Sequence, residues 1–255
     1  MTADRQATLT EAANFLLDAR RSGRALSSFP AALTPVDIPE VYAVQDRLAA
    51  TFGPIGGWKV GAPSPEATPM FCPMPQAWIA PSGSTLSGDH WRYRGLEAEI
   101  AFLVGKDLPP RATPYSREEA LAAMASCHPA IEVLETAFTD PTTVSREAGL
   151  ADLQLHGGFV PGPAFEDWRS VKFSTETISL NVDNVIQVER TGSNTSGDLL
   201  KLIPWLANEG AARTGGLRAG QWITTGSWTG NTPANNTSVV SAAFSRVGRV
   251  ELRFA

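Results

Sequence analysis

The chain has 255 residues, an ordinary globular composition, a formal net charge of −5 and a pI near 5.3. A chain of this length buries a sizeable core, so we expect one large domain or one domain with a smaller helical part. The acidic balance offers no basic surface for nucleic acid or for an anionic membrane, which leaves a small molecule as the expected partner.

The cysteine count and the lengths of the apolar runs argue against a disulfide-rich protein and against a membrane protein. Cys72 and Cys127 are the only cysteines, and their spacing matches neither a CxxC metal site nor a disulfide scaffold. The first 26 residues mix charges into every turn, and no later run reaches the length of a membrane span. We therefore expect a cytoplasmic protein without a membrane segment.

Helices are predicted at the start of the chain. Apolar residues recur at helical spacing over residues 9–24, with Thr10 as the expected N-cap. A second helix is predicted within residues 33–53, beginning after Pro35 and Asp37 and ending at Gly53. Residues 1–54 are therefore predicted to form an N-terminal helical region.

From residue 55 onward, Gly and Pro punctuate short β-branched runs that are typical of strands. These runs cover residues 57–62, 98–105, 130–138, 157–163, 177–190, 221–228 and 239–255. Helices are predicted between them at residues 116–125 and 198–213, and Pro204 predicts a kink or a late start in the second. The organisation is α+β, with residues 55–255 as a β-rich domain.

Two glutamates interrupt the apolar run "GLEAEIAFLVG". Glu97 and Glu99 are two positions apart, so on a strand both project to the same face. Two like charges held close together inside a protein require either a shifted pKa or a cation. A strand whose polar side faces solvent gives the same alternation, so the pattern alone leaves both interpretations open.

A third glutamate favours the cation. Glu132 lies in the strand-like run "HPAIEVLETAF", and Glu135 is expected on the opposite face of that strand. Three carboxylates suit Mg²⁺ or Mn²⁺ better than Zn²⁺, which prefers histidine or cysteine. The three histidines are scattered and form no ligand motif, so each is expected to be a surface or structural residue: His90, His128 and His156.

Two further segments offer polar groups to an anionic ligand. Lys59 lies between glycines in "GGWKVGA", where its ammonium either meets an acid substrate or lies on the surface. The turn "TGSWTG" offers backbone N–H groups and the Ser227 and Thr229 hydroxyls to a carboxylate, although such turns are also common connectors.

Taken in order, these segments resemble the 2-keto-4-pentenoate hydratase branch of the fumarylacetoacetate hydrolase superfamily. The resemblance runs almost end to end through "LLDARRSGRAL", "LTPVDIPEVYAVQDRL", "GWKVGAPS", "GLEAEIAFLVGKDLP", "HPAIEVLETAF", "GLADLQLHGGFVPG" and "PWLANEGAARTGGLRAGQWITTGS". It implies a β-rich mixed-sheet roll of the fumarylacetoacetate hydrolase type with a short helical N-terminal region. It also implies a homo-oligomer.

The resemblance also assigns residues to the site. It implies that Glu97, Glu99 and Glu132 hold Mg²⁺ or Mn²⁺. Lys59 is expected to position the substrate or transfer a proton, and Asp152 to orient water or Lys59. The residues assigned to the substrate are Ser227, Gly226 and Leu153.

The chain departs from the family pattern at several positions. Leu153 occupies a position where the family has Asn, Leu155 replaces a small polar residue, and Asp198 stands at a His position. Residues 63–83 are rich in proline and are expected to be either a segment that closes over the ligand or a plain surface loop. These changes affect specificity more than metal binding.

The resemblance implies hydration of an unsaturated 2-oxo or 2-hydroxy acid of the 2-hydroxypenta-2,4-dienoate type, through a metal-stabilised enolate, in the catabolism of aromatic compounds. Decarboxylation of a 4-oxalocrotonate-like acid uses the same enolate and is the first alternative. Carbon–carbon hydrolysis of an acylpyruvate is the second, with His156 or His90 as the base. A non-catalytic binding protein on the same scaffold is the third.

Overall fold

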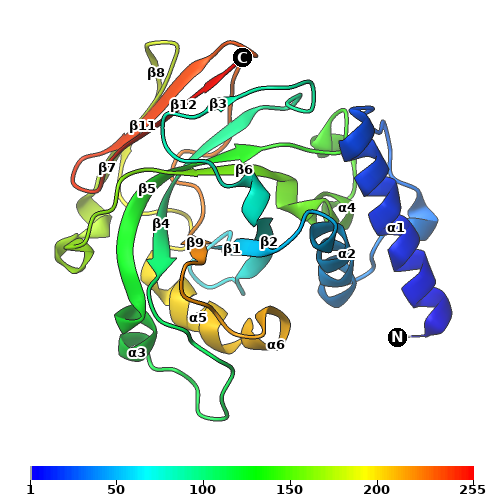
Figure 1. Ribbon diagram of the computed structural model, residues 1–255, viewed down its shortest axis with the longest axis horizontal. Helices are drawn as coiled ribbons and strands as arrows, with labels where there is room; N and C mark the ends of the chain where they lie inside the picture. The colour runs from blue at the N-terminus through cyan, green and yellow to red at the C-terminus, as the bar shows by residue number, and fades with distance from the viewer. Residues whose placement is uncertain (1) are drawn as a thin grey trace.

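The computed structural model describes residues 2–255 and consists of two β-sheets with helices packed at their margins (Figure 1). The α-helices are α1 (Ala3–Ser22), α2 (Ile38–Ala50), α3 (Arg117–Ala122), α4 (Arg146–Ala151), α5 (Leu202–Asn208) and α6 (Ala211–Thr214). The strands are β1 (Ile55–Gly61), β2 (Met70–Pro75), β3 (Thr85–Leu86), β4 (Gly95–Val104), β5 (Met124–Leu134), β6 (His156–Pro161), β7 (Thr177–Val182), β8 (Val185–Thr191), β9 (Trp222–Thr224), β10 (Thr232–Pro233), β11 (Val239–Phe244) and β12 (Gly248–Phe254). The α+β class predicted from the sequence is confirmed.

The two sheets have different sizes and topologies. The larger sheet has seven strands in the order β2-β1-β9-β4-β5-β6, with β10 paired to β4. The smaller sheet has five strands in the order β3-β12-β11-β7-β8. Strand β9 runs parallel to β1 and antiparallel to β4. A late strand therefore joins two early strands, and this arrangement brings distant parts of the chain together.

One face of the larger sheet packs against the smaller sheet. Ile100 and Ile131 of the larger sheet lie in the same fully buried apolar cluster as Leu180 and Val240 of the smaller sheet. Burying a side chain of this size contributes about 1.5–3 kcal/mol of transfer free energy. Because side chains alternate along a strand, the neighbours of Ile100 and Ile131 point to the opposite face of the larger sheet.

The N-terminal helices begin at side-chain caps. Helix α1 begins after Thr2, not at Thr10 as predicted; the Thr10 hydroxyl instead donates to the Gln6 carbonyl within the helix, at 2.9 Å. The helix continues further toward the N-terminus because Thr2 provides the cap and leaves Thr10 mid-helix. Gly23 ends α1 with a left-handed φ of 68°. Asp37 caps α2, close to the predicted start.

Helices α1, α2 and α4 enclose a second apolar cluster. They lie together at one side of the molecule (Figure 1). The cluster contains Leu16 and Leu48 from the first two helices, and Cys72 and Leu153 from later segments. Residues on both sides of position 54 therefore share one core, and the predicted domain boundary there stays a prediction.

Strand β5 differs in its limits from the prediction. It covers Met124–Leu134 instead of residues 130–138, and the preceding helix α3 ends at Ala122 instead of residue 125. Ser116 and Glu119 form a capping box at the start of this short helix. Pairing of β5 along β4 extends the strand back to Met124, so cross-strand pairing overrides the local helical pattern.

The proline-rich residues 63–83 contain a strand that was not predicted. Strand β2 covers Met70–Pro75 and pairs with β1, so the lid or loop interpretation is wrong for this part of the segment. Proline is tolerated because β2 is at the edge of the sheet, where a missing N–H leaves no neighbouring strand unpaired. Phe71 and Met74 on this strand are buried.

The remaining predicted elements are close to those observed. Residues 177–190 form the hairpin β7–β8, which turns at Asp183 and Asn184, both with positive φ. Pro204 lies in the first turn of α5, after a separate 3₁₀ turn, so the late start is confirmed. Within residues 2–255, no helix combines the length and the apolar character that crossing a bilayer requires.

Candidate metal centre

Strands β4 and β5 bring three glutamates to one face of the larger sheet. Glu97 and Glu99 both project from β4 to this face. Glu132 on β5 lies directly opposite Glu97 in the antiparallel register. Glu99 and Glu132 are 0% exposed, so the interpretation of this pattern as a solvent-facing strand is wrong.

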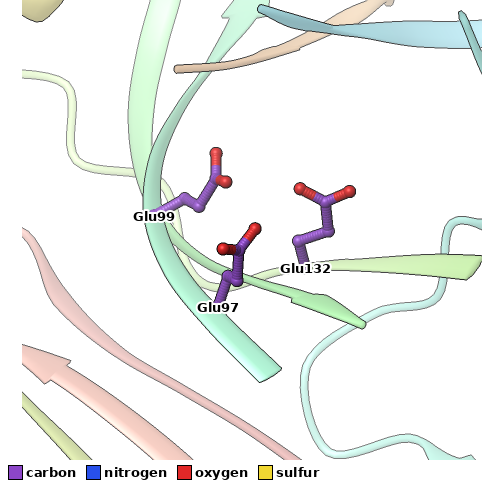
Figure 2. Close-up of side chains that lie close together, drawn as sticks. All are labelled: Glu97, Glu99 and Glu132. Carbon is purple, nitrogen blue, oxygen red and sulfur yellow. The ribbon is translucent and has the colours of Figure 1, made fainter. Parts of the chain in front are cut away.

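The three carboxylates converge on a shared space (Figure 2). One oxygen from each of Glu97, Glu99 and Glu132 lies within 4.8 Å of the other two. Negative charges at this separation repel one another strongly inside a protein, where the effective dielectric constant is low. The cluster therefore requires protons or a cation to balance its charge.

In each of the two fully buried glutamates, one carboxylate oxygen accepts hydrogen bonds from other groups of the protein. Glu99 Oε2 accepts hydrogen bonds from the Thr224 hydroxyl and from the Gly226 N–H, the latter at 2.8 Å. Glu132 Oε1 accepts from Lys59 Nζ at 2.8 Å and from His156 Nδ1 at 2.9 Å. The other oxygens, Glu99 Oε1 and Glu132 Oε2, are buried and have no hydrogen-bond partner in residues 2–255.

Burial and neighbouring charges separate the pKa values of the glutamates. Burial raises the pKa of Glu99 well above its usual range, and the negative charges of Glu132 and Glu97 raise it further. Burial also raises the pKa of Glu97. For Glu132 the effect of burial is outweighed by the Lys59 ammonium and the His156 hydrogen bond, which lower its pKa to about 2. Glu97 and Glu99 thus retain protons more readily than Glu132 does.

The donor set fits a divalent cation that prefers oxygen. Unpartnered buried polar atoms are uncommon in folded proteins and call for a missing partner. Glu99 Oε1 and Glu132 Oε2 are two such atoms in one cluster, and Glu97 adds a third carboxylate. Mg²⁺, Mn²⁺ and Ca²⁺ take oxygen ligands of this kind, whereas Zn²⁺ prefers nitrogen and sulfur.

Lys59 is placed beside this cluster by β1. Its side chain is 14% exposed, and Nζ donates to Glu132 Oε1 at 2.8 Å and to the Gln154 carbonyl at 3.1 Å. Burial alone would lower the pKa of Lys59, but the charges of Glu132, Glu97 and Glu99 outweigh it and raise the pKa. Lys59 is therefore a cation that contacts the cluster, and the surface-lysine interpretation is wrong.

His156 also belongs to the cluster, which its sequence context did not reveal. It is fully buried at the start of β6, its Nδ1 bonds to Glu132, and its ring stacks on Trp78 with centroids 5.8 Å apart. Burial lowers its pKa. Because 24 residues separate it from Glu132, no local spacing indicates the contact; only the pairing of β5 with β6 brings the two together.

The other two histidines lie outside the cluster. His128 is buried on β5, with Nδ1 at 2.8 Å from the Gly162 carbonyl and Nε2 at 2.8 Å from the Ser126 hydroxyl. His90 is exposed, and its ring lies against Trp91. The expectation of a structural and a surface histidine is confirmed for these two residues.

Asp152 is bonded at both of its carboxylate oxygens. Its side chain is fully buried, and Oδ1 accepts from Arg20 Nε at 2.6 Å. Oδ2 accepts from the Thr136 hydroxyl at 2.8 Å and from the Ala137 N–H at 2.7 Å. Both oxygens are thus bonded to other groups of the protein, including an ion pair with Arg20. The role of Asp152 in orienting water or Lys59 stays a prediction.

The turn after Asp152 has an unusual backbone. Leu153, Gln154 and Leu155 have φ values of 53°, 52° and 63°, in the left-handed region that disfavours residues with a Cβ. Gln154 presents its carbonyl oxygen to Lys59. The Leu153 side chain is fully buried in the cluster formed by the N-terminal helices. The assignment of Leu153 to the substrate stays a prediction.

The turn after β9 lies beside Glu97 and Glu99. The Gly226 N–H donates to Glu99 Oε2 at 2.8 Å, and contact of Gly226 with a substrate stays a prediction. The Ser227 hydroxyl accepts from the Gly230 N–H at 2.9 Å, and its proximity to Glu97 counteracts the effect of burial on the Glu97 pKa. Contact of Ser227 with a substrate carboxylate stays a prediction.

Asp198, the departure at a histidine position, lies on the surface. It caps the 3₁₀ turn Leu199–Lys201 and pairs with Arg117 at 2.7 Å. Both side chains are substantially exposed. The structure thus gives this substitution a local capping role.

The comparisons with known proteins agree with this fold. The family model described as "Fumarylacetoacetate (FAA) hydrolase C-terminal" matches residues 44–255. A 2-hydroxyhexa-2,4-dienoate hydratase from Comamonas testosteroni is 28% identical over 138 residues, a match that covers 54% of this chain and 51% of that protein. This chain thus spans about half the length of that relative.

Solved structures extend the similarity to the whole chain. The 4-oxalocrotonate decarboxylase from Pseudomonas putida G7, complexed with magnesium and adipate, has a TM-score of 0.83 at 20% identity and covers 100% of this chain and 99% of its own. The 2-hydroxyhepta-2,4-diene-1,7-dioate isomerase from Mycobacterium marinum has a TM-score of 0.61 at 17% identity, covering 79% and 76%. At these identities the structures support the fold, and the family model supports membership: the chain belongs to the fumarylacetoacetate hydrolase family.

Proposed function

We propose that the protein is a lyase that depends on Mg²⁺ or Mn²⁺ and hydrates an unsaturated 2-oxo acid of the 2-hydroxypenta-2,4-dienoate type. The observation that carries the proposal is the pair of buried, unpartnered oxygens, Glu99 Oε1 and Glu132 Oε2, beside Glu97. Similarity to a 2-hydroxyhexa-2,4-dienoate hydratase supports the choice of reaction. The proposal places the reaction in the catabolism of aromatic compounds.

Glu97, Glu99 and Glu132 are the residues that would hold the cation. When bound, a divalent cation supplies Lewis-acid chemistry, because it attracts the 2-oxo and carboxylate oxygens of the substrate and stabilises negative charge that develops there. Thr224 and Gly226 orient Glu99 through its other oxygen, and outer hydrogen bonds of this kind fix the direction of a ligand.

Lys59 is proposed as the group that moves a proton or holds the substrate. Its ammonium is held at 2.8 Å from Glu132, beside the carboxylate cluster, from where it can donate to a substrate oxygen. Ser227, beside Glu97, is proposed to donate its hydroxyl hydrogen to the substrate carboxylate. His156 keeps Glu132 oriented.

Hydration of a 2-hydroxy-2,4-dienoate balances as the addition of one water. The proton of the 2-hydroxyl leaves and a proton adds to C5, which gives the 2-oxo-3-enoate. The hydroxyl group of water then adds to C4 and the remaining proton of water adds to C3, so the product is the 4-hydroxy-2-oxo acid. Lys59 and Ser227 are the groups of the chain proposed to guide these proton movements. Oriented groups of this kind lower the barrier by fixing the reacting atoms in place.

The test is turnover of a panel of unsaturated 2-oxo acids and acylpyruvates with Mg²⁺ or Mn²⁺, with the products identified by mass. We expect a product heavier by one water, and we expect Glu97→Ala to abolish it. Glu118→Ala, at an exposed position on α3, is the matched control and should retain full turnover.

The other products distinguish the alternatives. Loss of carbon dioxide would replace hydration with decarboxylation, and cleavage of the carbon chain would replace it with hydrolysis. Absence of turnover together with absence of metal binding would favour a non-catalytic binding protein on the same scaffold.

The cytoplasmic location and the homo-oligomer stay part of the proposal. Sedimentation of the purified protein tests the oligomer, which is expected to have a mass that is a multiple of the 27.2 kDa chain. Cell fractionation tests the location.

A further inference from the structure

We infer that Arg20, on the N-terminal helix α1, is a positioning residue that acts on Lys59 through the left-handed turn at residues 153–155. The inference rests on the proposed function, because it assigns an indirect role in the same reaction. It also assigns a role to α1, which lies outside residues 44–255, the part of the chain that the family model matches.

Arg20 binds four acceptors around this turn. Its Nε donates to Asp152 Oδ1 at 2.6 Å, and one terminal nitrogen donates to the His156 carbonyl at 3.0 Å. The other terminal nitrogen donates to the carbonyls of Asp152 and Glu135, both at 3.0 Å. A single planar guanidinium thus fixes both ends of the turn and the segment that follows β5.

The turn needs such support because its backbone is unfavourable. Leu153, Gln154 and Leu155 are three consecutive residues with positive φ, and none of them is glycine. Left-handed conformations persist in residues with a Cβ only where the surroundings hold them, and they concentrate at functional sites. Asp152, held by Arg20 and by Thr136, anchors the beginning of the turn.

The result of this geometry is the direction of one carbonyl. The Gln154 carbonyl accepts from Lys59 Nζ at 3.1 Å, and Glu132 Oε1 accepts from the same nitrogen at 2.8 Å. These two acceptors together fix where the ammonium lies relative to the carboxylate cluster. If the turn relaxed, Lys59 would keep Glu132 but lose its second fixed partner.

The charge of Arg20 is paired with Asp152, so its hydrogen-bond geometry is the feature expected to matter most. The carboxylate cluster itself comes from β4 and β5, and the contacts of Arg20 lie on the 152–156 segment and on the carbonyl after β5. Changing Arg20 should therefore change the reaction rate more than the metal affinity or the substrate affinity.

The main experiment compares Arg20→Lys with Arg21→Lys. A lysine keeps the charge near Asp152 but cannot reach four acceptors, whereas Arg21 lies on the exposed side of α1 over the Phe52 ring. We expect Arg20→Lys to lower kcat about 100-fold, as displacement of a reacting group by about 1 Å does, with KM and the Mg²⁺ dissociation constant within about threefold. Arg21→Lys should keep all three values.

Arg20→Ala provides a second test if it folds. Millimolar guanidinium should restore a measurable part of kcat to Arg20→Ala and none to Arg20→Lys, because only the alanine variant leaves space for the ion. A fall in kcat that follows the loss of folded protein, without rescue and with an equal loss of Mg²⁺ affinity, would show a purely structural role and overturn the inference.

Hydrogen exchange gives a readout that does not depend on turnover. In the full chain, Arg20→Lys should accelerate exchange of the amides in residues 152–157 and leave those in residues 97–100 unchanged. Unchanged exchange in residues 152–157 overturns the inference. If the wild-type protein turns over no 2-oxo acid, the proposed reaction fails, and the exchange result alone decides whether Arg20 holds the turn.

Discussion

Two groups of buried carboxylates in this molecule have opposite surroundings. Asp152 has both oxygens bonded, to Arg20, Thr136 and Ala137. Glu99 and Glu132 each keep one buried oxygen without a partner among residues 2–255. Because an unpartnered buried oxygen costs free energy, the comparison distinguishes a carboxylate whose bonds are all made within the fold from carboxylates that can still accept a further partner.

The largest change in unfolding free energy is expected when Asp152 is replaced, because both of its carboxylate oxygens are bonded. Asp152→Ala leaves Arg20 buried without its partner, and breaking one side of a buried ion pair costs about 3–5 kcal/mol of unfolding free energy. Urea unfolding measures the change. Since no cation ligand is lost, Mg²⁺ affinity in the folded variant should stay within about threefold of wild type, as calorimetry would show.

Replacing Glu99, a proposed metal ligand, should lower the Mg²⁺ affinity strongly, which Asp152→Ala should not do. Glu99→Gln keeps the shape but removes the charge, and we expect Mg²⁺ affinity to fall by more than about 100-fold, because loss of an outer hydrogen bond alone costs 10–100-fold. In the wild type, Mg²⁺ at 100 times its dissociation constant should add about 2.7 kcal/mol of stability. In Glu99→Gln this increment should disappear at the same concentration, whereas Glu118→Gln should keep it. A full increment in Glu99→Gln would show that Glu99 is not a ligand.

Buried histidines should make the unfolding free energy depend on pH. His128 is bonded at both nitrogens, and burial lowers its pKa below the usual value near 6.5. In the unfolded chain His128 takes up a proton as the pH falls below about 6.5, whereas the folded protein does not until its lower pKa is reached. The contribution to stability is therefore present above this range and is lost as the pH falls through the folded pKa.

The measurement is urea unfolding of wild type and His128→Gln between pH 7.5 and 5. The difference in unfolding free energy between the two should shrink as the pH falls. An equal difference at all pH values would contradict the lowered pKa. Burial also lowers the pKa of His156. Because His156 is present in both the wild type and the variant, its contribution cancels in the difference.

The smallest effect is expected at a bonded carboxylate on the surface. Asp198→Ala removes the exposed pair with Arg117 and a 3₁₀ cap, and exposed pairs contribute about 0–1 kcal/mol. Thermal unfolding should change little, and Mg²⁺ affinity should not change. A large loss of metal affinity in Asp198→Ala would give this departure from the family pattern a functional role that its position does not indicate.

Much of the cluster was predictable because its signal is local. Glu97 and Glu99 are acids placed two residues apart in an apolar run, and strand geometry alone puts them on one face. Glu132 shows the same signal, an acid in a strand-like apolar run. The family resemblance, confirmed over residues 44–255, joined these residues to Lys59 before any contact was known.

The errors share one physical cause, which is that contacts between distant segments override local patterns. Edge pairing with β1 makes Met70–Pro75 a strand despite its prolines. Pairing with β4 extends β5 back to Met124, into residues that were predicted to be helical. The roles of Arg20 and His156 depend on contacts across 132 and 24 residues, and no spacing in the sequence encodes them.

The α+β class, the glutamates of the cluster and the family follow from the amino-acid sequence alone, because strand alternation and motif order are properties of short segments. Three features emerge only from the folded chain: which carboxylate oxygens lack a partner among residues 2–255, the ion pair of Asp152 with Arg20, and the left-handed turn whose Gln154 carbonyl accepts from Lys59. The reason is that hydrogen-bond satisfaction depends on every neighbour in space, whichever part of the chain supplies it.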